Sequence, residues 1–169
     1  SSSISAVGAP DLPSRTTFIA VDPSKSYSLQ VSYGSSRVIE NIDIAPKGDW
    51  NELGSDQSIS ETNYSNIESF YPTNIALLSE PMAMRELSLV SLTVSPFRYF
   101  PQEKRLEEFM DIEVELIETG NRESINFFPN KRSRAFEPLY ESLVENYSSL
   151  NRENIPYQRP SILYVLPNN

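Results

Sequence analysis

The chain has 169 residues, of which 38 % are hydrophobic and 11 % aromatic, so it is long enough and apolar enough for one domain with a core. Its net charge of -9 argues against nucleic acid as a partner, because phosphate binding needs a concentrated basic surface. The absence of cysteine and histidine excludes disulfides and thiol catalysis, and removes the commonest general base and transition-metal ligand. No cofactor is expected, and no apolar run is long enough to span a bilayer.

The first half of the chain predicts β-strands joined by turns. Residues 18–21 form a short apolar run, and residues 26–33 alternate strictly between polar and apolar side chains, which is typical of a half-buried strand. The Gly-Ser-Ser stretch at 34–36 predicts a hairpin turn, and residues 38–44 predict the returning strand. The high ratio of proline to glycine, 13 to 5, also favours an all-β chain with rigid connections.

A long irregular segment follows at residues 46–74. Loops of this length inside compact domains are usually functional or disordered. The segment contains Trp50, Phe70 and Tyr71 among many polar residues. Such aromatic side chains can anchor a partner, or they can attach the loop to its own domain, and both interpretations remain open.

The middle of the chain predicts further strands. Residues 75–78 form a short apolar strand, and residues 87–94 a longer one. The apolar parity of the longer strand changes between Leu89 and Val90, which predicts a β-bulge. Residues 106–116 alternate again, with four apolar side chains facing inward: Met110, Ile112, Val114 and Leu116. We expect these two longer strands to form an antiparallel hairpin.

Three carboxylates alternate with those apolar residues. Asp111, Glu113 and Glu115 must share one face of the strand, because side chains two apart in a strand point the same way. A row of this kind can serve a carboxylate hydrolase or hold calcium. The favoured interpretation is the solvated face of a half-exposed sheet, because a single strand lacks the opposed geometry of a glycosidase site. No metal site is therefore expected.

The C-terminal third predicts a helix and a linker. Residues 126–128 predict a last short strand, and residues 133–151 a helix capped by Ser133. The apolar stripe of this helix comprises Phe136, Leu139, Tyr140, Leu143, Val144 and Tyr147. The basic cluster before it, Lys131, Arg132 and Arg134, is expected to pair with acids or to lie in a loop. Residues 152–160 are polar and rich in proline, and residues 161–169 predict the first strand of a further domain.

Five stretches, in this order, resemble the N-terminal prodomain of gingipain-type cysteine peptidases, a bacterial family with a caspase-like catalytic domain. They are GAPDLPSRTTFIAV, IENIDIAPKG, the long block from SFYPTN to ELIET, FEPLYESLVENYSSLNR and RPSILYVLP. Within the long block, the likeness includes an aromatic-aromatic-Pro start and a Pro-x-x-x-R-(D/E) turn. The resemblance covers nearly the whole chain.

The resemblance implies a non-catalytic prodomain of an exported, secreted or cell-surface peptidase. Residues 1–151 would form a β-sandwich prodomain with one C-terminal helix, residues 152–160 a processing linker, and residues 161–169 the first strand of the peptidase domain. The prodomain would assist folding of that peptidase, its partner, and hold it latent until cleavage. The family's catalytic histidine and cysteine belong to the peptidase domain and are absent here.

The resemblance also implies two functional segments. Family members insert a basic side chain into the peptidase from just before the aromatic-Pro motif, and here the inhibitory loop is Ile67, Glu68, Ser69, Phe70 and Tyr71. In the best-known members that residue is basic, whereas Glu68 and Ser69 stand here, which argues against an Arg- or Lys-specific partner or against this mode of blocking. The processing site is expected between Arg152 and Glu153, with the Arg152 backbone exposed and extended, because proteases need an extended substrate.

Two other classes compete with this interpretation. One is a stand-alone β-sandwich adhesion or carbohydrate-binding module, and the other is a carboxylate enzyme. The strand predicted at residues 161–169 discriminates against the complete module, which has no use for it.

Overall fold

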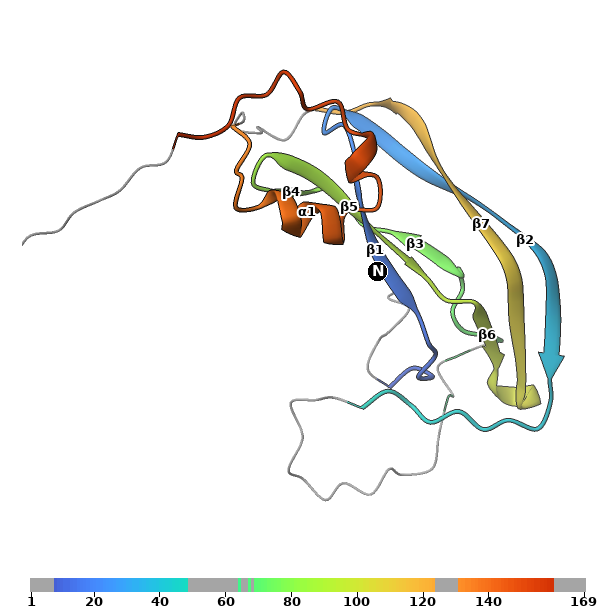
Figure 1. The fold of residues 1–169 in the computed structure, drawn as a ribbon. Helices are drawn as coiled ribbons and strands as arrows, with labels where there is room; N and C mark the ends of the chain where they lie inside the picture. The colour runs from blue at the N-terminus through green and yellow to red at the C-terminus, as the bar shows by residue number, and fades with distance from the viewer. Residues whose placement is uncertain (1–7, 49–63, 65–66, 68, 124–130, 160–169) are drawn as a thin grey trace, which may run out of the picture.

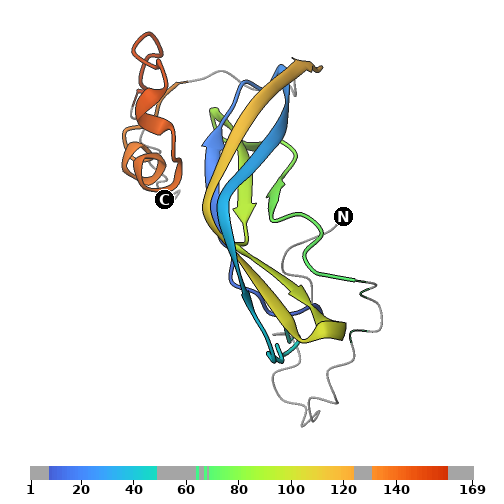
Figure 2. The same cartoon turned by 90° about the vertical axis from the view of Figure 1, so that its right-hand side faces the viewer.

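The computed structural model describes residues 8–48, 64, 67, 69–123 and 131–159. Its described part consists of two antiparallel sheets and one short helix, which confirms the predicted fold class. Figure 1 shows the sheets side by side in a curved molecule, and Figure 2 shows α1 as a separate layer on one side of them. The expected strand at residues 126–128 and the terminal strand at 161–169 lie outside the described residues.

The first sheet is built around β5 (Leu87–Val94). β1 (Arg15–Ala20) pairs along one edge of β5, while β3 (Ala76–Leu78) and β4 (Met82–Met84) pair along the other. β5 pairs with these neighbours without a register shift, so the bulge predicted between Leu89 and Val90 is wrong. The parity change has another cause: Leu87 and Leu89 pack against the helix side, whereas Val90 faces the second sheet, so β5 is buried on both faces.

The second sheet is dominated by two long strands. β2 (Lys25–Ile39) pairs with β7 (Arg105–Asn121), which also pairs with β6 (Phe97–Phe100). The hairpin turn predicted at residues 34–36 is wrong, because β2 runs through them along β7, with Ser35 opposite Met110. A Cβ atom at Gly34 would lie 3.1 Å from the Asp111 Cβ, so the close approach of the two strands favours glycine here.

The predicted hairpin between residues 87–94 and 106–116 is also wrong. These strands lie in different sheets, and the hairpin partner of β7 is β6, joined to it by a short 3₁₀ turn, η2 (Pro101–Glu103). Asp111 has a φ of 56° in the middle of β7. The buried positions change parity there, from Phe109 to Ile112, so Met110 is exposed rather than inward. The register shift between β2 and β7 lies elsewhere, at Ser26 and Tyr27.

The core divides into two hydrophobic clusters at opposite ends of the sheets. The helix-side cluster comprises Ala20, Leu87, Leu89, Tyr140, Val144 and Tyr147. The loop-side cluster comprises Leu12, Tyr64, Tyr99 and Leu106, with half-buried residues such as Ile42 and Ile67 packed against it. Each cluster lies under one of the segments that the sequence singled out for function.

The C-terminal helix is shorter than predicted. α1 (Glu137–Leu143) has seven residues, and a 3₁₀ turn, η3 (Tyr147–Ser149), follows it. The helix ends because Val144 turns to bridge Phe18 of β1, and the Asn146 side chain then hydrogen-bonds both the N–H and the carbonyl of Ala20, at 2.8 and 2.9 Å. Tertiary contacts with β1 thus override the helical pattern. The Ser133 side chain does not cap α1, whose N-cap is Phe136.

Candidate inhibitory loop and processing segment

The end of the long loop is attached to β6 by backbone pairing. The Tyr71 N–H donates to the Tyr99 carbonyl at 2.8 Å, and the Tyr99 N–H donates to the Tyr71 carbonyl at 2.7 Å. The Tyr71–Pro72 peptide bond is cis. Tyr71 therefore continues the second sheet instead of projecting from it.

Two buried tyrosines, Tyr64 and Tyr99, attach the loop to the domain. The rings of Tyr64 and Tyr99 meet edge-on with their centroids 6.0 Å apart. The Tyr64 hydroxyl donates to the Ile44 carbonyl at 2.6 Å, and the Tyr99 hydroxyl donates to the Ile42 carbonyl at 3.0 Å. Burial raises the pKa of Tyr64 to about 12, so the hydroxyl stays a donor at neutral pH.

Phe70 is fixed by Arg98. The Arg98 guanidinium lies 4.7 Å from the centroid of the Phe70 ring and 5.2 Å from that of Phe109, and Phe70 also packs on Phe100 at 5.6 Å. Aromatic stacking replaces polar partners at the Arg98 Nε, which is buried without a hydrogen bond. Of the two interpretations of the loop aromatics, the structure supports attachment to the domain for Phe70 and Tyr71. Trp50 lies outside the described residues.

The loop residues before Phe70 are placed in part. Ile67 packs half-buried against the loop-side cluster, and its N–H donates to the Tyr64 carbonyl at 2.9 Å. Ser69 is exposed, and Glu68 lies outside the described residues. Within the predicted inhibitory loop, Ser69 is thus the described residue most open to contact with a partner.

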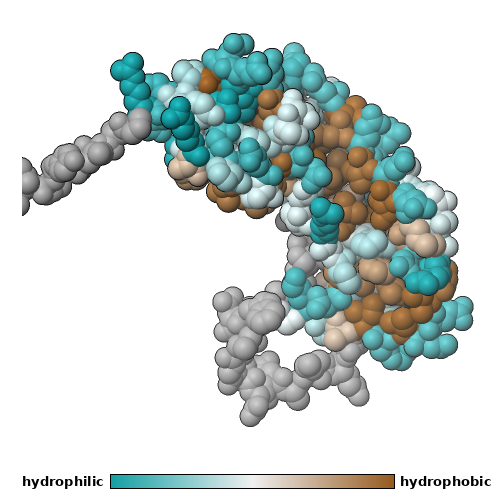
Figure 3. All heavy atoms as spheres, viewed as in Figure 1, coloured by the Kyte–Doolittle hydropathy of each residue, from teal (hydrophilic) through white to brown (hydrophobic). Residues whose placement is uncertain are grey.

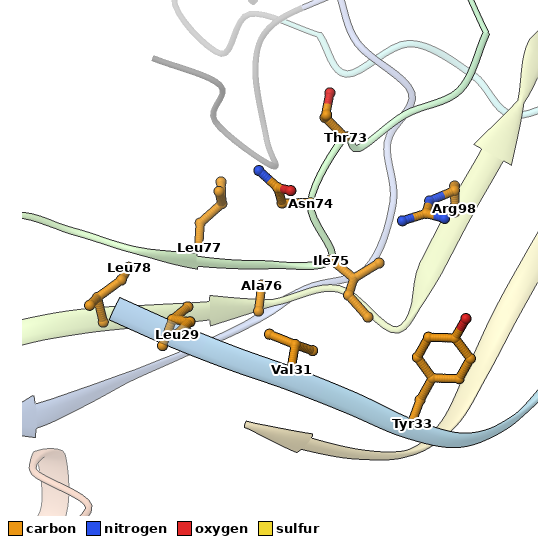
Figure 4. Close-up of a pocket in the computed structure, with 10 residues that line it drawn as sticks. All are labelled: Leu29, Val31, Tyr33, Thr73, Asn74, Ile75, Ala76, Leu77, Leu78 and Arg98. Carbon is orange, nitrogen blue, oxygen red and sulfur yellow. The ribbon is translucent and has the colours of Figure 1, made fainter. Parts of the chain in front are cut away.

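A groove of about 490 Å³, lined by both apolar and polar side chains, lies next to the loop. Figure 4 shows Leu29, Val31 and Tyr33 of β2 facing residues 75–78, with Arg98 at one end of the groove. Tyr33 is half-exposed, at 51 %. Figure 3 shows apolar side chains gathered along the bend of the molecule.

The processing segment is anchored by a buried ion pair. The Arg152 Nη2 lies 3.0 Å from the Glu86 Oε1, and only 6 % and 5 % of the two side chains are exposed. The Arg152 Nη1 donates to the Tyr147 hydroxyl and lies 4.0 Å from the Glu137 Oε1. The Tyr140 hydroxyl donates to the second Glu86 oxygen at 3.1 Å. Both terminal nitrogens of Arg152 and both oxygens of Glu86 thus have partners, as a buried ion pair requires.

Glu137 is the second centre of this cluster. Arg132 donates to both of its oxygens, at 2.9 and 3.1 Å, and the Tyr147 hydroxyl donates to it as well. The hydrogen bonds from Arg132 hold the pKa of Glu137 below its ordinary value. Burial raises the pKa of Tyr147 to about 12. We call Arg152, Glu86, Glu137, Tyr147 and Arg132 together the Arg152 cluster.

The Arg152 backbone is not exposed and extended, so that expectation is wrong. Its carbonyl accepts hydrogen bonds from the Ile155 N–H at 3.1 Å and from the Arg132 Nη1 at 3.2 Å, which closes a turn. The Arg132 N–H donates to the Pro156 carbonyl at 3.0 Å, and the Gln158 N–H donates to the Arg132 carbonyl at 2.8 Å. The polar, proline-rich composition of this segment did not reveal that buried carboxylates elsewhere would bind its arginine.

The basic cluster behaves as predicted. Arg132 pairs with Glu137, and the guanidinium of Arg134 lies 4.9 Å from the centroid of the Tyr157 ring. The acidic row on β7 is exposed, with Glu113 opposite Ser32 and Glu115 opposite Gln30. No group of three or more metal-ligating side chains occurs within the described residues. The described part of the chain also contains no helix long and apolar enough to cross a membrane.

A known protein family matches most of the chain. The Propeptide_C25 family model matches residues 1–149. The chain belongs to this gingipain propeptide family. Its members are non-catalytic prodomains of cysteine peptidase precursors.

The relatives are gingipains of Porphyromonas gingivalis. The chain is 28 % identical to gingipain R2 over 153 residues, covering 86 % of this chain and 20 % of gingipain R2. It is also 28 % identical to a gingipain R1 over 151 residues, covering 85 % of this chain and 15 % of that protein. The chain thus spans a fifth or less of the length of these relatives.

Two solved structures share the fold. One is the complex of the RgpB pro- and mature domains of Porphyromonas gingivalis, with a TM-score of 0.69 and 27 % identity, covering 87 % of this chain and 76 % of that one. The other describes the zymogenic latency of gingipain K from the same organism, with a TM-score of 0.55 and 19 % identity, covering 68 % of each chain. The second likeness shows the fold alone.

Glu86 is the functional-site residue that sequence reasoning missed. Residues 81–86 carry the Pro-x-x-x-R-(D/E) turn shared with the family. The motif was visible, but only the structure shows that its acidic residue binds Arg152, 66 residues away.

Proposed function

We propose that this chain is the prodomain of a secreted or cell-surface, gingipain-like cysteine peptidase, and that it chaperones and inhibits the peptidase domain of the same precursor until proteolytic removal. The observation that carries this proposal is the family match over residues 1–149 together with the likeness to a pro- and mature-domain complex. Membership in a propeptide family favours this function over an adhesion or carbohydrate-binding module.

The inhibitory contact is proposed for the loop Ile67, Glu68, Ser69, Phe70 and Tyr71. The support is that Phe70 and Tyr71 are fixed on β6 while Ser69 is exposed, so the domain presents a short segment on a rigid base. No basic residue occurs among these five. We therefore propose that the loop blocks the active-site cleft without inserting a lysine or an arginine.

An inhibition assay tests the loop. The chain is added to the peptidase domain of its own precursor, and hydrolysis of a peptide substrate is followed. In the test variant, Ile67, Glu68 and Ser69 are all replaced by glycine, which leaves the anchors Phe70 and Tyr71 in place. We expect the inhibition constant to rise at least tenfold, about 1.4 kcal/mol.

The matched control replaces Ser26 and Ser28, at the far end of β2, with glycine. It should inhibit like the wild type. Equal inhibition by the loop variant and the wild type would place the blocking contact elsewhere.

Processing is proposed at the Arg152–Glu153 bond, with residues 1–151 as the prodomain, 152–160 as the linker and 161–169 as the start of the peptidase domain. The support is the arginine that follows the Asn146–Tyr147 pair and the end of the family match at residue 149. N-terminal sequencing of the mature peptidase tests this assignment. A terminus at Glu153 agrees with it, and a terminus elsewhere contradicts it.

A further inference from the structure

The conformation of the Arg152–Glu153 bond does not match the one that a peptidase binds. A peptidase that recognises arginine needs the side chain in its specificity pocket, the carbonyl at its oxyanion-binding donors and an extended backbone. In the structure the Arg152 side chain is 94 % buried against Glu86, its carbonyl already accepts two hydrogen bonds, and its backbone forms a turn with Ile155. All three features conflict with cleavage at once.

We propose that the Arg152 cluster is a latch that protects the processing bond, and that cleavage occurs only after the segment from Arg152 to Gln158 detaches from Glu86 and Glu137. The proposal rests on the processing site assigned above and adds its regulation. Detachment frees the side chain, the carbonyl and the backbone together, because the same cluster binds all of them. Hydrolysis then adds water across the amide, giving the Arg152 carbonyl carbon a hydroxyl and the Glu153 nitrogen a proton.

The geometry places the latch between distant parts of the chain. Glu86 lies beside β5, Glu137 belongs to α1, and Arg132 precedes α1. The cluster therefore forms only when the sheet and the C-terminal segment have packed together. A chain that is still folding exposes the bond, whereas the folded prodomain conceals it. Removal of the prodomain then depends on local opening rather than on the arrival of a protease alone.

Limited digestion with trypsin measures this protection directly. The initial rate of cleavage at Arg152–Glu153 in the 169-residue chain is compared with the rate in a synthetic peptide of residues 147–158, which cannot form the cluster. When opening is fast relative to cleavage, the ratio of rates reports the population of the open form. We expect cleavage in the chain to be at least about tenfold slower, and Glu86→Gln to restore most of the peptide's rate.

Two controls isolate the cluster. Glu80→Gln also removes a carboxylate from an arginine, but the Glu80–Arg122 pair is on the surface, with 90 % of the Glu80 side chain exposed. It should leave the rate at Arg152 unchanged. Cleavage at Arg37–Val38, within β2, reports global unfolding. If Glu86→Gln accelerates both bonds equally, Tyr147→Phe, which removes the hydrogen bonds of the hydroxyl with Arg152 and Glu137, must accelerate cleavage at Arg152 alone.

The outcomes separate the latch from the processing assignment. Equal rates in the chain and the peptide, or an unchanged rate at Arg152 in a folded Glu86→Gln variant, would overturn the latch. A mature peptidase that begins at a residue other than Glu153 would overturn the assignment instead, whatever trypsin shows. If both hold, the whole precursor carrying Glu86→Gln should release its prodomain faster than the wild type.

Discussion

The two proposed functional segments are attached to different sheets by different kinds of interaction. The inhibitory loop is held by aromatic rings and backbone hydrogen bonds, through Phe70, Tyr71 and the Tyr64–Tyr99 pair. The processing segment is held by buried charges, through Arg152, Glu86 and Glu137. Aromatic anchoring is almost insensitive to acid, whereas a buried ion pair fails when one charge is removed. Loss of one charge should therefore release the proposed processing segment and leave the proposed inhibitory loop in place.

The largest expected effect comes from breaking the ion pair. Glu86→Gln removes the nearest carboxylate from the buried Arg152 guanidinium and leaves only Glu137 at 4.0 Å, and the loss of one partner from a buried pair costs about 3–5 kcal/mol. Urea denaturation should show this decrease in the free energy of unfolding, whereas Glu80→Gln should leave the midpoint unchanged. A loss below about 1 kcal/mol would mean that the pair is solvated and that the two segments do not differ as described.

The second-largest expected effect is a different response of the two segments to acid. The pKa of Glu137 is lowered by its hydrogen bonds from Arg132, so its stabilising contribution is present above the ordinary value of 4.5 and is lost as the pH falls below it. The pKa of Tyr64, raised to about 12, changes its contribution only between pH 10 and 12. Acidification from about pH 6 to about pH 3 should therefore detach the processing segment first.

Hydrogen exchange read by mass spectrometry checks the effect of acid. After correction for the intrinsic rate, the segment from Arg152 to Gln158 should lose protection at low pH, while β6 keeps its protection. Glu137→Gln should remove most of this pH dependence. Loss of protection in both regions at the same pH would contradict the comparison.

A smaller effect is expected in the loop. Tyr64→Phe removes the hydrogen bond to the Ile44 carbonyl but keeps the ring, and one such hydrogen bond contributes about 1 kcal/mol. Denaturation should detect a loss of this size that does not depend on pH below about 9. Tyr33→Phe, at a half-exposed ring, is the control and should be neutral. A loss confined to acidic conditions would show that charges, not aromatic packing, hold the loop.

The smallest effect is expected on the acidic row of β7. Glu113 is exposed opposite Ser32, so Glu113→Gln should change the free energy of unfolding by less than about 0.5 kcal/mol. Calcium at millimolar concentration should leave the thermal midpoint of the wild type unchanged. A calcium-dependent rise in the midpoint that Glu113→Gln removes would reveal a metal site there.

Local pattern by itself located several of the strands, although it did not find β4 or β6. The alternation at residues 26–33 and 106–116 lies within β2 and β7, and the apolar run at residues 75–78 contains β3, because side-chain periodicity reports directly which residues share a face. The family's motifs could also be recognised in the sequence, in their order, and they indicated the family. The exposed position of the acidic row also followed from alternation alone.

Only the tertiary structure decided which strands pair and which charges are buried. β5 and β7 are close in sequence yet lie in separate sheets, because β6 and its 3₁₀ turn intervene and supply the hairpin. α1 ends early because Asn146 binds the backbone of β1, and Arg152 is buried because Glu86 lies beneath it. These contacts join residues dozens of positions apart, so no local pattern encodes them. The composition of a segment shows that it is polar, but it does not show which residues its charged side chains pair with.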